Sequence, residues 1–179
     1  DLLGHGLTLR SAPGHGSRFG IVAPRAADAP PTRLRPPTAV RSLAGACIAV
    51  IDDDPAAVDG MRALFSTWGA EIAGGAHADA VLAALGEAER YPDLIVADLR
   101  LGDDASGLAA IARMRDELGE PVPALVVSGD LRAGTAREVR EAGFLLLAKP
   151  VVPASLEAAA STLVASRDHA ENLPAPMPW

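Results

Sequence analysis

Three acidic residues in a row end an apolar run early in the second quarter of the sequence. Residues 50–55 read VIDDDP, so the run stops at Asp52, Asp53 and Asp54. Like charges at this spacing repel one another, and an ionised carboxylate beside a core loses hydration. Turn or helix-cap chemistry explains one acid, most simply Asp54 ahead of Pro55. Asp52 and Asp53 are left without a structural reason, which favours a chemical role for them.

Further polar residues follow three later apolar runs. LIVAD ends in Asp98, ALVVS ends in Ser128 and is followed by Gly129, and FLLLAKP contains Lys149. Each residue alone has an ordinary role open to it as a turn residue, a helix cap or a solvated charge. Their joint placement after four separate apolar runs is much less ordinary, and it indicates a shared site.

The combination has a definite chemistry. Clustered carboxylates need a counter-charge, and Mg²⁺ typically binds one or two carboxylates together with waters and a phosphate oxygen. An Asp carboxylate can attack phosphorus and form an aspartyl-phosphate. Lys149 can neutralise phosphate oxygens as a point charge, and Ser128 can donate a hydrogen bond to them. Gly129 leaves space for a phosphoryl group to enter. On this interpretation Asp52 and Asp53 hold the metal ion.

Alternating strands and helices must position these residues. We predict strands near residues 46–51, 70–74, 94–98, 123–128 and 144–148. We predict helices near residues 55–68, 77–90, 107–118, 132–142 and 153–166. This order predicts an α/β fold with a five-stranded parallel sheet covered by helices on both faces. Because ligands bind at the carboxyl ends of such strands, we expect the polar residues above to meet in one cleft.

The helix expected near residues 132–142 has the weakest apolar stripe. Only Ala136, Val139 and Ala142 contribute to it. We therefore expect this helix to be the least firmly packed and most mobile element of the domain.

Composition excludes several classes of function. The 179 residues carry a net charge of −7, and no Lys/Arg cluster stands out, which argues against nucleic acid or an anionic membrane as a partner. No stretch approaches the roughly 18 apolar residues of a membrane span. The single cysteine, Cys47, is expected to be a small buried core residue, which fits a reducing, cytoplasmic setting.

The flanks differ from the central domain at residues 45–167. In residues 1–24, apolar residues alternate around a Gly-rich turn, which predicts a β-hairpin. Residues 25–44 are rich in Pro and are expected to form a linker, and residues 168–179 a flexible tail. The sequence begins with Asp1 rather than Met, so we expect a fragment of a longer chain.

The motifs VIDDDP, PDLIVADLRL, ALVVSGD and AGFLLLAKPV resemble, in order and spacing, those of response-regulator receiver domains of two-component signalling. The resemblance spans about residues 45–167 and implies a flavodoxin-like (βα)5 fold with strand order 2-1-3-4-5. It also implies that Asp98 is the phosphoacceptor, that Ser128 is the switch hydroxyl and that Lys149 is the family's lysine. The ligands it implies for Mg²⁺ are Asp52, Asp53, Asp98 and the backbone carbonyl of Arg100. The Lys149–Pro150 bond is often cis in such domains.

Two positions depart from the family's pattern. Many receivers carry an aromatic residue three positions before the lysine, where this sequence has Leu146. Ser128 is then expected to act without an aromatic partner. The position two after the acceptor is Arg100, a bulky cation that we expect to alter the lifetime of the aspartyl-phosphate by screening or blocking water.

The segment LLGHGLTLRSAPGHGSRFGIVAP resembles the last strands of a histidine-kinase ATPase domain, although a generic Gly-rich hairpin is the alternative. The nucleotide-binding motifs of such kinases are absent from the sequence, so we expect no ATP binding by this chain alone. None of its four histidines resembles a phosphodonor or has metal-ligand spacing; they are His5, His15, His77 and His169. The order of segments resembles the C-terminus of a hybrid sensor histidine kinase.

Three functions compete. The leading hypothesis is a Mg²⁺-dependent phosphoacceptor that takes a phosphoryl group from a histidine-kinase phosphodonor domain, expected in the same polypeptide, and passes it to a histidine phosphotransfer protein. It would catalyse only its own phosphorylation and dephosphorylation. The second is a Mg²⁺ phosphatase with its nucleophile in the first strand's acids, but this leaves Asp98 without a role. The third is a receiver-like interaction module that is never phosphorylated.

Overall fold

The computed structural model describes residues 6–12, 14, 16–22, 42–102, 105–130 and 132–171. The chain divides into two compact units, Asp1–Pro36 and Pro37–Trp179. Most of the predicted linker, His5, His15, the side chain of His169 and residues 172–179 lie outside the described residues.

The first unit contains a two-stranded antiparallel hairpin. Strand β1 (Gly6–Ala12) pairs with β2 (Gly16–Val22), with Gly6 opposite Val22 and Ala12 opposite Gly16. Gly14 and Gly16 have φ angles of 75° and 79°, a backbone region that a tight turn needs and that glycine enters without steric cost. The hairpin predicted from the alternating apolar residues is therefore present.

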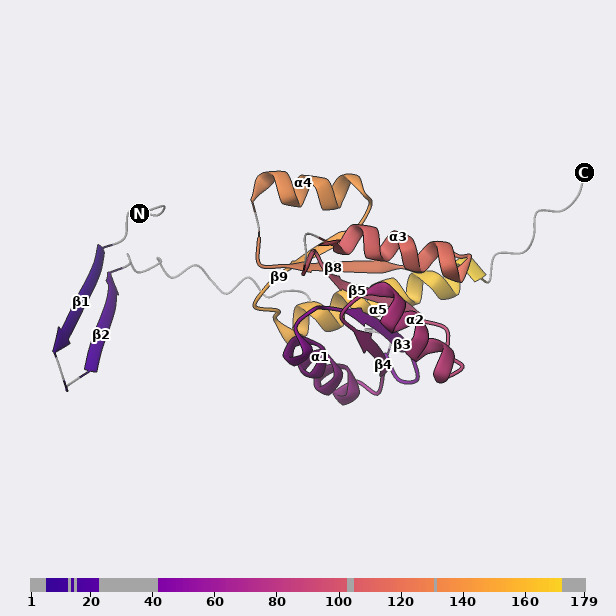
Figure 1. Ribbon diagram of the computed structural model, residues 1–179, viewed down its shortest axis with the longest axis horizontal. Coiled ribbons are helices and arrows are strands. Elements are labelled where there is room, and N and C mark those ends of the chain that lie inside the picture. The colour runs from indigo at the N-terminus through magenta and orange to yellow at the C-terminus, as the bar shows by residue number, and fades with distance from the viewer. Residues whose placement is uncertain are drawn as a thin grey trace, which may run out of the picture. The chain divides into compact units, whose positions relative to one another are not determined.

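The second unit, called here the α/β unit, is built on a five-stranded parallel sheet (Figure 1). Its strands are β3 (Cys47–Ile51), β4 (Glu71–Gly75), β5 (Leu94–Asp98), β8 (Ala124–Ser128) and β9 (Leu145–Ala148). They lie in the order β4-β3-β5-β8-β9, so the first strand of the unit is flanked by the second and the third. The predicted fold and the strand order 2-1-3-4-5 are confirmed.

Four helices connect the strands of the sheet, and a fifth follows the last strand. They are α1 (Pro55–Thr67), α2 (Ala78–Glu87), α3 (Gly107–Leu118), α4 (Ala133–Glu141) and α5 (Pro153–Glu171). Side chains that accept hydrogen bonds from the first turn begin three of them: Asp54 caps α1, His77 caps α2 and Ser106 caps α3. Asp54 thus has the capping role that the sequence predicted for it, and His77 is a structural residue.

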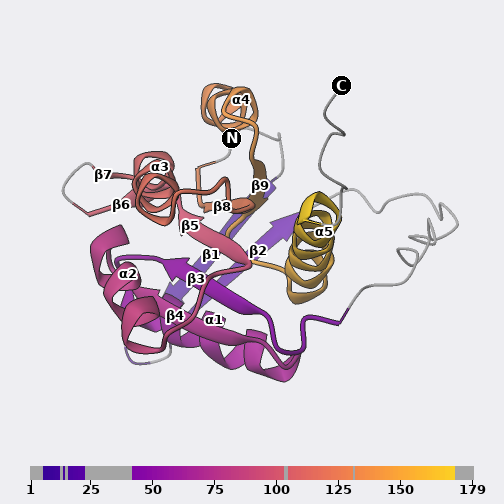
Figure 2. The same ribbon diagram turned by 90° about the vertical axis from the view of Figure 1, so that its right-hand side faces the viewer.

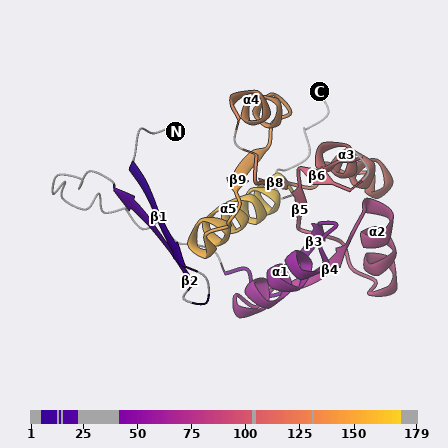
Figure 3. The ribbon, with the colours of Figure 1, turned by 60° about the vertical axis from the view of Figure 1, so that its left-hand side comes forward.

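The helices cover both faces of the sheet. Buried residues of α2, α3 and α4 pack with alternate residues of the central strands on one face, and those of α1 and α5 pack on the other. Figures 2 and 3 show α2 and α3 on the side of the sheet opposite α5. Strands β3, β5 and β8 are buried along almost their whole length because both of their faces are covered. Among the described helices, none has the length and apolar character to cross a bilayer.

Three local features were not predicted from the sequence. A short antiparallel pair, β6 (Arg100–Leu101) with β7 (Ala105–Ser106), follows β5. Helix α5 continues to Glu171, five residues beyond its predicted end, through a stretch without Gly or Pro. Leu43, assigned to the linker, is 2% exposed and belongs to the core beneath α1 and α5.

Candidate functional site

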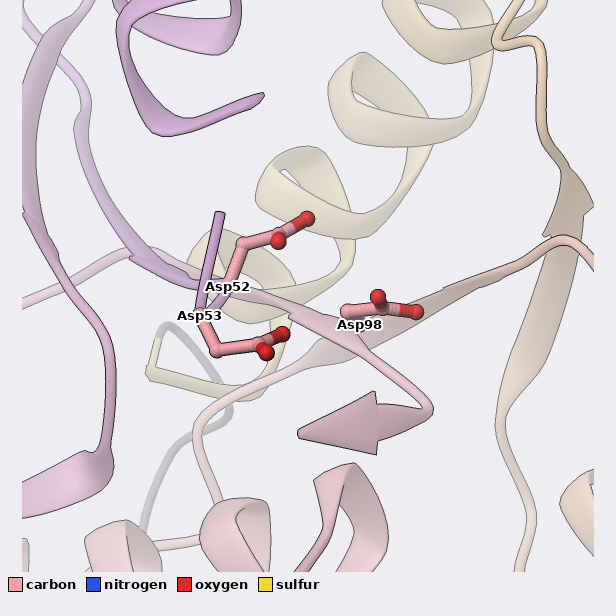
Figure 4. Close-up of side chains that lie close together, drawn as sticks. All are labelled: Asp52, Asp53 and Asp98. Carbon is pink, nitrogen blue, oxygen red and sulfur yellow. The ribbon is translucent and has the colours of Figure 1, made fainter. Parts of the chain in front are cut away.

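The predicted polar residues meet at the carboxyl edge of the sheet. Asp52 and Asp53 follow β3, and Asp98 is the last residue of the neighbouring β5. One carboxylate oxygen from each of the three acids lies within 4.8 Å of the others, and Figure 4 shows the three side chains clustered together. Asp52 is buried, Asp98 is partly buried and Asp53 is exposed. The acids therefore form one site that is closed on the core side and open to solvent beside Asp53.

Lys149 supplies the counter-charge to this cluster. Its Nζ donates hydrogen bonds to Asp52 Oδ2 and Asp98 Oδ2, each at 2.9 Å. Burial disfavours the ammonium charge, but the hydrogen bonds to the two acids outweigh burial and raise the pKa of Lys149 above its ordinary value. The Lys149–Pro150 peptide bond that follows is cis.

The cluster fits a hard divalent cation. Oxygens that share a Mg²⁺ ion at 2.0–2.1 Å lie up to about 4.2 Å apart, so small rotations of the three carboxylates would bring them to one ion. Asp52 has one further fixed contact, since its Oδ1 accepts a hydrogen bond from the Asp54 backbone N–H at 3.0 Å. Oxygen-only donors are the set that Mg²⁺ prefers.

The β6–β7 pair sets the direction of the Arg100 carbonyl. Gly107 donates its N–H to the carbonyl of Leu99 at 2.9 Å, and Arg100 lies opposite Ser106. Hydrogen-bonded and non-hydrogen-bonded pairs alternate in an antiparallel ladder, so the Arg100 carbonyl points away from β7. This geometry leaves that carbonyl free of the ladder, as its predicted role as a metal ligand requires.

Gly107 is a site residue that was not predicted from the sequence. A Cβ atom at this position would lie 2.0 Å from the carbonyl oxygen of Asp98 and 3.1 Å from the Cα of Leu99. The first turn of α3 therefore packs directly on the backbone of Asp98. The only signal in the sequence is a glycine at a predicted helix start, and the residue type alone does not show which backbone lies against it.

Ser128 and Gly129 border the space beside Asp98. Ser128 is buried at the end of β8, and its Oγ accepts a hydrogen bond from the Asp130 backbone N–H at 3.0 Å. A Cβ at Gly129 would meet nothing within 4 Å, so the backbone there leaves room. A pocket of about 460 Å³ opens at this point, and its lining includes Asp98, Arg100 and Ser128.

An ion-pair cluster at the rim of this pocket was also not predicted. Asp130 contacts the guanidinium groups of Arg100 and Arg132. Hydrogen bonds from the side chain and backbone N–H of Arg132, together with those from Arg100 and Thr135, hold the pKa of Asp130 well below its usual range. Lone polar residues in the stretch SGDLR gave no reason to expect this cluster, because Arg100 reaches it from a different loop.

Two other predicted residues lie in the core. Leu146 is partly buried and packs against the cluster formed with α2, α3 and α4. Cys47 is buried in β3 as predicted, and burial raises the pKa of its thiol.

Comparison with known proteins identifies a family that matches residues of the α/β unit. Residues 48–161 match the response regulator receiver domain family. No curated protein sequence matches the chain. Among solved structures, the chain is similar to a receiver domain protein from Clostridium thermocellum (TM-score 0.61, 19% identity), with 70% of this chain covering 98% of that one.

Two further structures are similar to the chain. A CheY-like receiver domain protein from Methanospirillum hungatei JF-1 has a TM-score of 0.59 and 21% identity, over 71% of this chain and 99% of that one. The response regulator PhyR from Brucella abortus has a TM-score of 0.59 and 18% identity over 74% of this chain, which spans 52% of PhyR. At these identities the likeness is one of fold. The family match spans more than half of the residues of this chain, so the chain belongs to the response regulator receiver domain family.

Proposed function

We propose that the α/β unit is a Mg²⁺-dependent phosphoacceptor of two-component signalling, with Asp98 as the residue that receives the phosphoryl group. The observation that supports this best is the position of Lys149 Nζ, 2.9 Å from both Asp98 Oδ2 and Asp52 Oδ2. Asp98 also lines the pocket of about 460 Å³ that is described above. The acid to be modified and the cation that would balance the incoming charge are already side by side.

The reaction uses the Asp98 carboxylate as the nucleophile. One of its oxygens attacks the phosphorus of a phosphohistidine, a P–O bond forms and the P–N bond breaks, with its electron pair returning to the imidazole nitrogen. Lys149 then shifts its interaction toward the transferred phosphoryl oxygens, and the Ser128 hydroxyl donates a hydrogen bond to them. In dephosphorylation a water oxygen bonds to phosphorus, the P–O bond to Asp98 breaks, and inorganic phosphate and a proton leave.

The residues that would hold Mg²⁺ are Asp52, Asp53, Asp98 and the backbone carbonyl of Arg100. When bound, the ion would neutralise the clustered carboxylates and the oxygens of the incoming phosphoryl group. Asp52 is buried and fixed through both of its oxygens, so it is the rigid side of this site. Asp53 is exposed and can move to meet the ion.

The biological setting is part of the proposal. The hairpin of β1 and β2 supports an origin at the end of a histidine-kinase ATPase domain, with the receiver following a Pro-rich linker. In that arrangement the phosphodonor histidine belongs to the parent kinase, and a histidine phosphotransfer protein receives the phosphoryl group. The net charge of −7 supports a protein partner rather than nucleic acid.

The test is intact-mass spectrometry of the chain after incubation with acetyl phosphate, with and without Mg²⁺. We expect a single phosphoryl adduct that requires Mg²⁺ and is absent in Asp98→Asn. The matched control is Asp116→Asn, which removes an exposed carboxylate near the C-terminal end of α3. This variant should be phosphorylated like the unmodified chain.

The other outcomes separate the competing functions. An adduct that persists in Asp98→Asn but is lost in Asp52→Asn would mean that the first-strand acid is the nucleophile, as in a phosphatase. Absence of an adduct with acetyl phosphate and with a phosphorylated histidine-kinase domain would leave the receiver fold as a protein-interaction module.

A further inference from the structure

The Asp130 carboxylate collects donors from two separate parts of the chain. Arg132 donates to it from Nε at 2.9 and 3.0 Å and from Nη2 at 2.6 Å, and Thr135 donates from Oγ1 at 3.2 Å. Arg100 pairs with the same carboxylate from β6. The Asp130 side chain is only 13% exposed, whereas that of Arg100 is 65% exposed. The carboxylate is therefore fixed, and the Arg100 guanidinium has room to move.

The Arg100–Asp130 pair separates two pockets. The first, of about 460 Å³, has Asp98 and Ser128 in its wall. The second, of about 450 Å³, lies toward α4 and is lined by residues that include Thr135 and Glu138. Arg100 and Asp130 line both pockets. A guanidinium in this place can face either the carboxylate it now holds or a new anion beside Asp98.

Charge favours such an exchange. Two guanidinium groups share one carboxylate, so Arg100 can leave while Asp130 keeps the other guanidinium. A phosphoryl group on Asp98 would add a nearly doubly charged anion with three acceptor oxygens to the same pocket. Guanidinium pairs with phosphoryl oxygens through short, charge-assisted hydrogen bonds, often two at a time. Asp130 keeps Arg132 and Thr135 when Arg100 leaves, so the exchange leaves this carboxylate paired.

We propose that Arg100 is a positioning residue that exchanges Asp130 for the phosphoryl group when Asp98 is phosphorylated, and that this exchange releases the start of α4. The inference rests on the proposed function, since it requires phosphorylation at Asp98. It gives this chain a route from the acceptor to α4 that does not need an aromatic side chain at the position of Leu146.

Helix α4 is built to respond to the loss of this contact. Among the described residues of this helix Val139 alone is buried, and Arg132 at its N-cap makes no side-chain capping bond. Asp130 instead holds the start of the helix from outside it, because its Oδ1 accepts the Arg132 backbone N–H at 3.1 Å and its Oδ2 accepts from the Thr135 hydroxyl at 3.2 Å. Through Asp130, Arg100 therefore connects the start of α4 to β6. When the Arg100 guanidinium leaves, Asp130 holds the start of α4 to the β8–α4 loop alone.

The experiment follows amide hydrogen exchange at Ala136, whose N–H donates to the Arg132 carbonyl at 3.0 Å in the first turn of α4. Phosphorylation with acetyl phosphate and Mg²⁺, checked by intact mass in the same samples, should speed exchange at this amide about two- to fivefold. That range is what the loss of one exposed ion pair produces. In Arg100→Ala the amide should exchange at the faster rate already before phosphorylation and change little afterwards.

Three variants make the test specific. Asp130→Asn breaks the pair from the other side and should also reduce the response to phosphorylation. Arg100→Lys keeps the positive charge and should restore part of the response. The matched control is Arg113→Ala, which removes a similarly exposed arginine from α3 and the ion pairs that it forms with Asp79 and Glu117. This control should respond like the unmodified chain.

The outcomes distinguish the inference from the proposed function. If the unmodified chain takes up no phosphoryl group, the proposed function fails and this inference fails with it. If the adduct forms but exchange at Ala136 stays constant, or if Arg100→Ala responds as fully as the unmodified chain, the partner exchange is wrong and the phosphoacceptor function stands.

Discussion

Residue 107 shows how closely the position of Asp98 depends on a neighbour that performs no chemistry. In Gly107→Ala the new Cβ would lie 2.0 Å from the Asp98 carbonyl oxygen, well inside any real contact. The obstacle is backbone rather than a flexible side chain, so β5 or α3 must shift. We expect the variant to lose about 1–3 kcal/mol of unfolding free energy. Phosphorylation by acetyl phosphate should also slow, because the shift displaces Asp98. Urea unfolding and intact-mass time courses measure the two effects.

A second glycine provides the control. Gly60 lies in the interior of α1, and a Cβ there would meet nothing within 4 Å. Gly60→Ala should therefore raise the free energy of unfolding by about 0.5–1 kcal/mol, since alanine loses less backbone entropy than glycine when a helix forms. If the two substitutions changed the free energy of unfolding and the phosphorylation rate equally, the contact with Asp98 would not be the reason that position 107 requires glycine.

The sequence was informative about site residues that follow one general rule. Asp52, Asp98 and Lys149 could be placed together because the ends of parallel strands share an edge. Gly107 and Asp130 could not be placed in this way. Their roles depend on how two loops fold back toward β5, and no periodic pattern in the sequence encodes that path.

Among the elements, helix α5 contains a buried polar group that brings no benefit for stability. Ser161 is 4% exposed, and within the described structure its Oγ has no hydrogen-bond partner. A buried hydroxyl without a partner is destabilising, and alanine is the better helix former. Ser161→Ala should therefore raise the free energy of unfolding by about 1 kcal/mol, which a urea titration can measure.

The neighbouring residue is a matched control for this substitution. Thr162 is exposed, and its hydroxyl donates to the Ala158 carbonyl at 2.7 Å within the same helix. Thr162→Ala should change stability by no more than about 0.5 kcal/mol. A clear loss of stability in Ser161→Ala would mean that the buried hydroxyl forms a bond in solution and would refute the prediction.

Regular elements were predictable to within a few residues because their apolar patterns are strong. Helix α1 was expected at 55–68 and spans Pro55–Thr67, and Gly69 follows it with a φ of 78°. The β6–β7 pair was missed because two-residue strands carry no periodicity. The end of α5 was placed too early because its apolar stripe fades before its helix-forming residues do.

At the scale of the whole molecule, the α/β unit contains the two cores that lie on either face of the sheet. The buried residues of these cores, across the described segments, run from Leu43 to Ala160. The described side chains of the hairpin are mostly exposed. An isolated two-stranded hairpin is at best marginally stable in water. Folding of the α/β unit should therefore not depend on the first unit.

Truncation tests this independence and locates the true start of the domain. A chain that begins at residue 42 should melt within about 2 °C of the full chain, because it keeps every core residue of the described segments. It should also form the same Mg²⁺-dependent adduct at Asp98. Adding Leu43→Ala to the short chain should lower the free energy of unfolding by about 2–4 kcal/mol, because this leucine is a core residue and is only 2% exposed. A large fall in melting temperature on truncation alone would mean that residues 1–41 make stabilising contacts. If Leu43→Ala left the free energy of unfolding unchanged, the stable domain would begin at β3 rather than at residue 42.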